Sequence, residues 1–146
     1  MTTKPTLRVR LGALHAVVSG IPLGLFVGGS LFDIASRISS EPAGYSRHAL
    51  WLFVAGAVMA VVAGIPGLLL LPVFEATSVR AALGRRHVLI TDAGLVVGIG
   101  SILLRWRGDA AGAVPTVPLL LGLVATGSIL AGGWLAATTR MSRADD

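Results

Sequence analysis

Four long apolar stretches occupy most of this chain of 146 residues. Residues 11–32, 49–74 and 110–139 contain no Asp, Glu, Lys or Arg over 22, 26 and 30 residues, whereas about 20 apolar residues suffice for a helix to cross a bilayer. A fourth stretch, residues 86–104, is mostly apolar but contains two charged residues, Arg86 at its start and Asp92. The sequence therefore predicts an all-α integral membrane bundle of four transmembrane helices, in which short connections make neighbouring helices antiparallel. We place the spans at about residues 11–34, 49–71, 86–104 and 117–137, in a single domain over residues 1–146.

Composition excludes several other classes of protein. Hydrophobic residues make up 54% of the chain and charged residues 13%, whereas soluble domains have about 25% charged residues. The net charge of +5 does not indicate a nucleic-acid partner, because the basic residues lie between apolar spans rather than on one soluble face. The sequence has no Cys, which excludes disulfides and thiolate metal ligands.

The basic residues predict how the chain is oriented in the membrane. One set, in the N-terminal segment, the second loop and the C-terminal tail, comprises Lys4, Arg8, Arg10, Arg80, Arg85, Arg86, Arg140 and Arg143. The opposite set comprises Arg37, Arg47, Arg105 and Arg107. Because Lys and Arg are retained on the cytoplasmic side, we expect a multi-pass protein of the bacterial cytoplasmic membrane with both termini in the cytoplasm.

Glycines recur at every fourth position along the predicted spans. Such small residues let helix backbones approach closely in lipid, where no hydrophobic force drives helices together. The glycines that we expect at packing surfaces are Gly20, Gly24, Gly28, Gly56, Gly64, Gly94, Gly98 and Gly132. They would serve contacts inside the bundle or with partner subunits, including further copies of the chain.

Two acidic residues lie within the predicted spans, where ionisable groups are functional candidates by default. Asp33 precedes Arg37 by four residues, a spacing at which the two side chains form an ion pair on one helix. Asp92 lies near the middle of the third span, where a carboxylate costs about 3 kcal/mol to insert. We expect Asp92 to face the bundle interior, protonated or paired with a basic group, with the polar Thr91 beside it.

Two histidines indicate a ligand site. His15 and His87 lie near the starts of the first and third spans, so alternating spans put both near the cytoplasmic side. Two imidazoles on different helices at similar depth can ligate one b-type haem or hydrogen-bond a quinone head group. Ordinary hydrogen bonding between helices is the structural alternative. Apart from a haem iron, no metal site is expected.

Motifs of soluble enzymes are missing from the sequence. There is no G-x-x-x-x-G-K-[ST] loop, no H-E-x-x-H and no G-x-S-x-G, the patterns that mark phosphate-binding, zinc-protease and serine-hydrolase sites. We therefore expect no catalytic residues and no enzymatic activity.

Five short motifs follow one another along the chain. They are His15-(x6)-Pro22-Leu23-Gly24-Leu25-Phe26, Phe32-Asp33, Pro66-Gly67-Leu68, Arg80-(x6)-His87 and Gly132-Gly133-Trp134-Leu135. In order and spacing the chain resembles, over nearly its whole length, the bacterial membrane-protein family catalogued as domain of unknown function 2231. The resemblance implies a four-span module that in some bacteria is fused to Rieske-type iron–sulfur domains, which favours a redox-linked setting. The chain departs from the family's pattern at Ala16, where the family usually has proline, and at four polar positions, which are Gly20, Leu70, Thr91 and Trp134 here.

Two functions fit these observations. The first is an accessory or structural subunit of a larger redox or respiratory membrane complex that binds partner subunits in the bilayer through its glycine faces. The alternative is an electron-transfer module that binds b-type haem or quinone through His15 and His87.

Overall fold

The computed structural model describes residues 7–70, 79–108 and 112–141 of the chain. These residues form five helices, whose bounds are α1 Leu7–Val18, α2 Gly20–Ile38, α3 Pro42–Leu70, α4 Val79–Arg107 and α5 Thr116–Met141. Four stretches are long and apolar enough to cross a membrane: Gly12–Ile38, Pro42–Leu69, Ala81–Arg107 and Thr116–Thr138. The prediction of four helical spans is confirmed, and each helical segment extends past the predicted span at one or both ends.

The first span is built from two helices rather than one. Helix α1 ends at Val18 and α2 begins at Gly20, so the interruption falls at Ser19, three residues before Pro22. A proline has no backbone N–H, so Pro22 leaves the carbonyl of Val18 without its helical donor, and its ring crowds that carbonyl. Pro22 therefore accounts for the break between α1 and α2.

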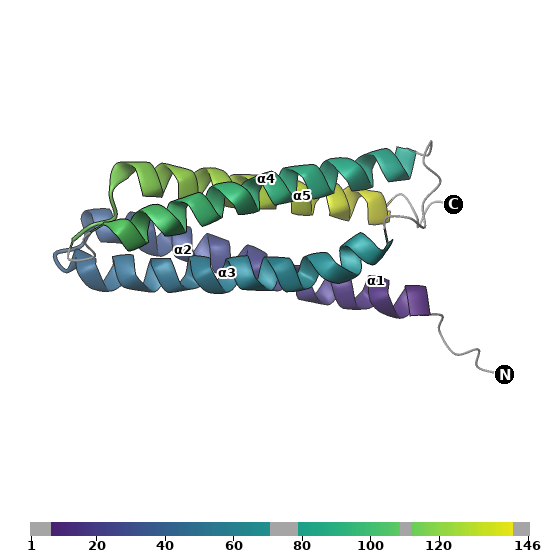
Figure 1. The fold of residues 1–146 in the computed structure, drawn as a ribbon, viewed down its shortest axis with the longest axis horizontal. Coiled ribbons are helices and arrows are strands. Elements are labelled where there is room, and N and C mark those ends of the chain that lie inside the picture. The colour runs from purple at the N-terminus through teal and green to yellow at the C-terminus, as the bar shows by residue number, and fades with distance from the viewer. Residues whose placement is uncertain (1–6, 71–78, 109–111, 142–146) are drawn as a thin grey trace.

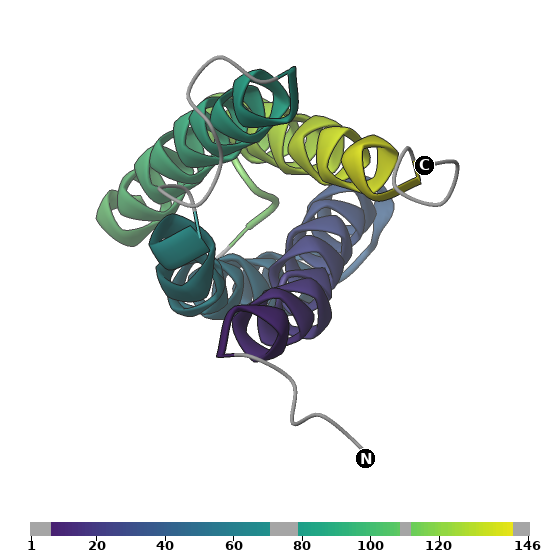
Figure 2. The same ribbon diagram turned by 90° about the vertical axis from the view of Figure 1, so that its right-hand side faces the viewer.

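The spans pack as two helix pairs. Helix α2 runs along α3, and α4 runs along α5, while α1 continues beside the second half of α3 (Figure 1). Viewed from one end, the four spans stand at the corners of a square (Figure 2). The starts of α1 and α4 and the ends of α3 and α5 lie at this end of the molecule, which we call the histidine end.

A small core joins the two pairs. Phe26 of α2 and Phe53 of α3 meet edge to face, with ring centroids 5.4 Å apart, and Ile102, Ala125 and Ile129 from α4 and α5 complete the cluster. Most large apolar side chains outside this core are exposed on the outer surface. That distribution is the one a bilayer allows, because lipid tails are as apolar as the side chains they touch.

The structure places some of the predicted packing glycines in close helix contacts and others in none. A Cβ at Gly56 or Gly98 would lie 2.8 Å from the Phe26 ring, and one at Gly94 would lie 2.7 Å from the Ser128 Cβ. Gly132 is equally tight and Gly28 is in ordinary contact with Leu52. At Gly20, Gly24 and Gly64, by contrast, a Cβ would meet nothing within 4 Å, so these three do not serve contacts within the described bundle.

Candidate functional site

His15 is held by the end of α3. Its Nδ1 donates a hydrogen bond of 2.9 Å to the Ala63 carbonyl, since a carbonyl oxygen can only accept. The imidazole lies against Gly67, where a Cβ would come within 2.9 Å of the His15 Cε1. The glycine at position 67 thus gives the half-buried ring its space between α1 and α3.

His87 is held in the same way by α5. Its Nδ1 donates a hydrogen bond of 2.8 Å to the Gly132 carbonyl, and a Cβ at residue 132 would lie 3.5 Å from that nitrogen. Helix α4 begins at Val79, eight residues before His87. His87 therefore lies two turns inside a helix rather than at its start, which brings it to the depth of His15.

The two histidines meet between the helix pairs. Their ring centroids are 6.4 Å apart and the ring planes are inclined by 77°, so the structure brings together the two residues that the sequence singled out. In a neutral imidazole that donates from Nδ1, the other nitrogen, Nε2, is unprotonated and acts as an acceptor or metal ligand. Among the residues that the structure describes, no group forms a hydrogen bond with Nε2 of either ring.

Thr91 lies one helical turn after His87 and adjoins the same site. Its hydroxyl is buried and has no hydrogen-bond partner within the described ranges. The same hydroxyl occupies the space that a Cβ at Gly132 would fill. A buried hydroxyl without a hydrogen-bond partner is unusual in folded proteins. This hydroxyl lies beside Gly132, whose carbonyl accepts the His87 hydrogen bond, so it adds a further polar group to the site.

Asp92 does not join this site, contrary to the prediction that it faces the bundle interior. The residue is exposed on the outer surface of α4. The helical period explains the difference: Thr91 and Gly94 turn toward α5, and at about 100° per residue the position after Thr91 is carried round to the outer face.

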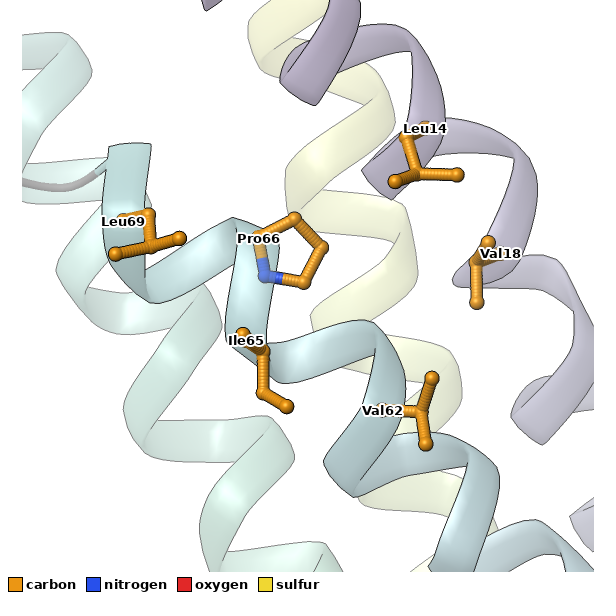
Figure 3. Close-up of a pocket in the computed structure, with 6 residues that line it drawn as sticks. All are labelled: Leu14, Val18, Val62, Ile65, Pro66 and Leu69. Atoms are coloured by element: carbon orange, nitrogen blue, oxygen red, sulfur yellow. The ribbon is translucent and has the colours of Figure 1, made fainter.

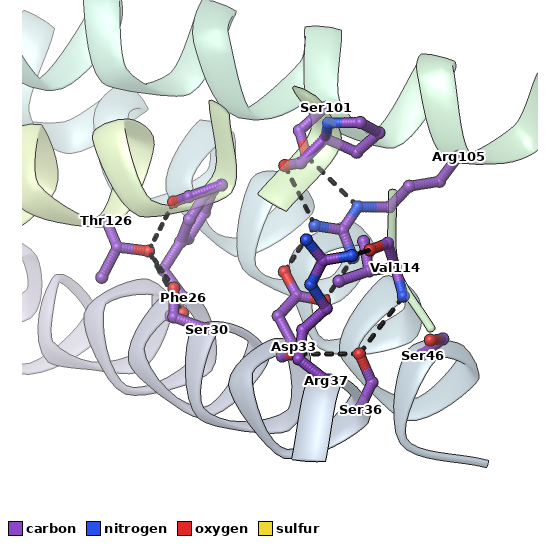
Figure 4. A network of polar contacts seen from close by, with 12 residues as sticks. Phe26, Ser30, Asp33, Ser36, Arg37, Ser46, Ser101, Arg105, Val114 and Thr126 are labelled. Atoms are coloured by element: carbon purple, nitrogen blue, oxygen red, sulfur yellow. Dashed lines mark hydrogen bonds and ion pairs between the residues drawn. The ribbon is translucent and has the colours of Figure 1, made fainter. Parts of the chain in front are cut away.

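A second polar cluster lies at the opposite end of the molecule (Figure 4). Arg105 of α4 donates two hydrogen bonds to Asp33 of α2. Nη1 donates to Oδ1 at 2.6 Å and Nη2 donates to Oδ2 at 2.5 Å. Asp33 is 0% exposed and Arg105 8%. Arg105 also donates to Ser101 Oγ and to the Pro118 carbonyl, both at 3.2 Å. We call these residues the ion-pair cluster.

The predicted pairing of Asp33 with Arg37 is wrong. Arg37 instead donates to the Val114 carbonyl at 3.1 Å and to Thr116 Oγ1 at 2.9 Å, fastening the end of α2 to the segment before α5. Asp33 turns away from Arg37 into the bundle, because a bidentate guanidinium stabilises a buried carboxylate more than an exposed contact does. The signal that sequence reasoning missed is Arg105 itself, which directly follows an uncharged run over residues 93–104.

The ion-pair cluster depends on a close approach of α5. A Cβ at Gly122 would lie 3.0 Å from the Phe53 Cζ, 3.3 Å from the Arg105 Nη2 and 3.4 Å from the Asp33 Oδ2. The Arg105 guanidinium also stands over the Phe53 ring, 4.9 Å from its centroid. The ion pair is therefore buried between helices. It links α2 and α4 to each other and to α5, and it offers no exposed group for a reaction.

An apolar groove lies beside the histidine site, on the outer surface between α1 and α3 (Figure 3). It has a volume of about 270 Å³. Its lining residues are Leu14, Val18, Val62, Ile65, Pro66 and Leu69. No lining side chain has a polar atom to react with or orient a ligand, so the groove itself offers no reactive group.

Comparison with known proteins gives one match. The family described as "Predicted membrane protein (DUF2231)" matches residues 12–143, a range that includes both histidines and the ion-pair cluster. No curated protein and no solved structure matches the chain.

Proposed function

This chain belongs to the DUF2231 family of predicted membrane proteins, and from the geometry of its histidines we propose that it is a membrane electron-transfer module that binds a b-type haem between His15 and His87. The observation that supports this proposal is that each imidazole already donates Nδ1–H to a backbone carbonyl, at 2.9 and 2.8 Å. Metal-ligating histidines are oriented in this way almost always, because the bond fixes the tautomer with Nε2 toward the metal.

His15 and His87, whose ring centroids are 6.4 Å apart, are the residues that would hold the haem iron. Within the described ranges no group of three or more His, Asp or Glu side chains could hold a metal ion by itself. Two histidines suffice for haem, since the porphyrin supplies the remaining four ligands. When bound, such a haem supplies one-electron chemistry.

A quinone is the less favoured ligand for the same site. A quinone head group offers carbonyl oxygens, which accept hydrogen bonds, and in neutral imidazoles that donate from Nδ1 both Nε2 atoms are also acceptors. A quinol hydroxyl would instead donate to one Nε2. The histidine pair therefore favours haem over quinone, and between the two oxidation states of a quinone it favours the reduced one.

The proposal predicts a haem spectrum that depends on two of the three histidines. Purified protein in detergent, oxidised and then reduced with dithionite, is expected to give the Soret and α bands of a b-type haem. His15→Ala or His87→Ala is expected to remove the bands or convert them to those of a five-coordinate haem. His48→Ala is the matched control, because His48 donates from Nδ1 to a carbonyl in the same way but is exposed at the opposite end of the molecule.

Two results would overturn the haem proposal. One is folded protein that stays colourless after titration with haem. The other is a spectrum that survives both substitutions unchanged.

An accessory role in a larger membrane complex is the second candidate function. Asp92 favours this role. An acidic side chain that is exposed in the middle of a membrane span has a high free energy when it faces lipid, and a partner protein that pairs with it lowers that free energy. Such a role assigns no reaction to the chain. Co-purification of a defined partner in mild detergent, lost in Asp92→Leu, is the test.

A further inference from the structure

Asp92 lies at the centre of an otherwise apolar outer surface. It is six residues after Arg86 and 13 before Arg105, the charged residues that bracket it on α4, or about 9 Å along the helix from the nearer one. Leu89 and Val96, one turn to either side, are 69% and 68% exposed. Ile99 and Leu103 continue the same exposed face, which we call the Asp92 face.

No group of the described bundle compensates this carboxylate. Asp92 has no hydrogen bond or ion pair with any residue in the described ranges, whereas the other intramembrane acid, Asp33, is fully buried against Arg105. A carboxylate at a span centre costs about 3 kcal/mol when it faces lipid. The chain thus stabilises one acid internally and presents the other outward.

We propose that the Asp92 face binds a transmembrane helix of another membrane protein that has a Lys or Arg side chain at the middle of the bilayer. Charge complementarity selects this partner, and the apolar residues around Asp92 select a membrane-embedded helix. This inference rests on the accessory role and names the chemistry of its partner; it does not depend on haem binding.

A second copy of the chain fits the Asp92 face less well. Two copies packed in the same orientation would place Asp92 against Asp92, and like charges repel at this depth. A second copy also has no exposed basic side chain among the described residues that could pair with Asp92, because these side chains lie toward the helix ends. These residues are Arg10, Arg37, Arg47, Arg85, Arg86 and Arg107. The remaining basic residue within a described span, Arg105, is already bound to Asp33.

The test uses a synthetic helix as the partner. A polyleucine transmembrane peptide with one central Lys is mixed with the full chain in phosphatidylcholine vesicles, and a peptide with Leu at that position is the control. Because the sequence has no Cys, Arg107→Cys gives a single labelling site at the end of α4, and energy transfer from a labelled peptide reports association. The Lys peptide is expected to bind the chain at least tenfold more tightly than the Leu peptide, and Asp92→Leu is expected to remove the difference.

A charge exchange provides an independent arm. Asp92→Lys paired with a peptide that has a central Glu is expected to restore association, whereas Asp92→Lys with the Lys peptide is not. Equal binding of the Lys and Leu peptides would overturn the proposal. So would energy transfer between two labelled copies of the chain that the Lys peptide fails to displace, because the occupant would then be a second copy. The haem spectrum of the same samples reports on the histidine site separately, so failure of either proposal is distinguishable.

Discussion

At the scale of single residues, the Asp33–Arg105 pair is the strongest polar interaction in the described bundle. The guanidinium binds both carboxylate oxygens, and the surrounding helices exclude solvent and lipid from both groups. A buried ion pair adds little net stability over an apolar pair of similar volume, but removing one partner leaves an uncompensated buried charge. The two kinds of substitution therefore have different consequences.

Asp33→Ala is expected to lower the free energy of unfolding by about 3–5 kcal/mol, because Arg105 then stays buried without its carboxylate. The double variant Asp33→Leu with Arg105→Leu removes both charges and is expected to recover most of that loss. Reversible unfolding in mixed detergent micelles measures both. A double variant as unstable as Asp33→Ala would show that the charges are not the cause, and that packing around Phe53 and Gly122 is.

Sequence reasoning found the histidine pair but not the ion pair, for a physical reason. His15 and His87 are rare polar residues near the same end of alternating spans, so topology alone brings them together. Asp33 had a local candidate partner four residues away, and local spacing contains no information on Arg105, which is 72 residues distant. Which side of a helix faces the bundle decided the outcome for both Asp33 and Asp92, and each apolar span is too uniform for its sequence to show that side.

At the scale of helices, the α4–α5 contact depends on glycine. A Cβ at Gly94 would lie 2.7 Å from the Ser128 Cβ and 3.1 Å from the Ala125 carbonyl oxygen, and a backbone atom cannot move aside as a flexible side chain can. Glycines spaced four residues apart predict such close contacts, and on α4 both Gly94 and Gly98 pack tightly. This spacing could not distinguish them from Gly24, because the same spacing also occurs on a face that meets nothing.

Gly94→Ala is accordingly expected to destabilise the protein by about 1–3 kcal/mol, since extra volume in a close-packed contact forces the two helices apart. Gly24→Ala is the matched control: nothing lies within 4 Å of its Cβ position, and alanine favours a helix by up to about 1 kcal/mol over glycine. Thermal unfolding in one detergent compares the two. If Gly24→Ala proved the more damaging, the Gly24 face would have to contact something outside the described bundle.

At the scale of the whole molecule, the two helix pairs are linked by different chemistry at their two ends. At one end the Asp33–Arg105 ion pair joins α2 to α4, and Ser30 bonds Thr126 of α5 at 2.8 Å. At the other end the histidines meet, each hydrogen-bonded to the helix beside it. At the histidine end, therefore, each histidine is hydrogen-bonded within its own helix pair, and neither of these two hydrogen bonds crosses between the pairs.

The orientation of the chain in the membrane is a prediction, and it determines which side of the membrane the histidine end faces. Eight basic residues flank the spans at that end against four at the other, so Lys and Arg retention places the histidine end in the cytoplasm. Since the chain has no Cys, Ser40→Cys and Arg86→Cys give single exposed reporters at opposite ends. A membrane-impermeant maleimide is expected to label Ser40→Cys on intact cells and Arg86→Cys only after permeabilisation. The reverse pattern would put the histidine pair on the outer side of the membrane and overturn the predicted orientation.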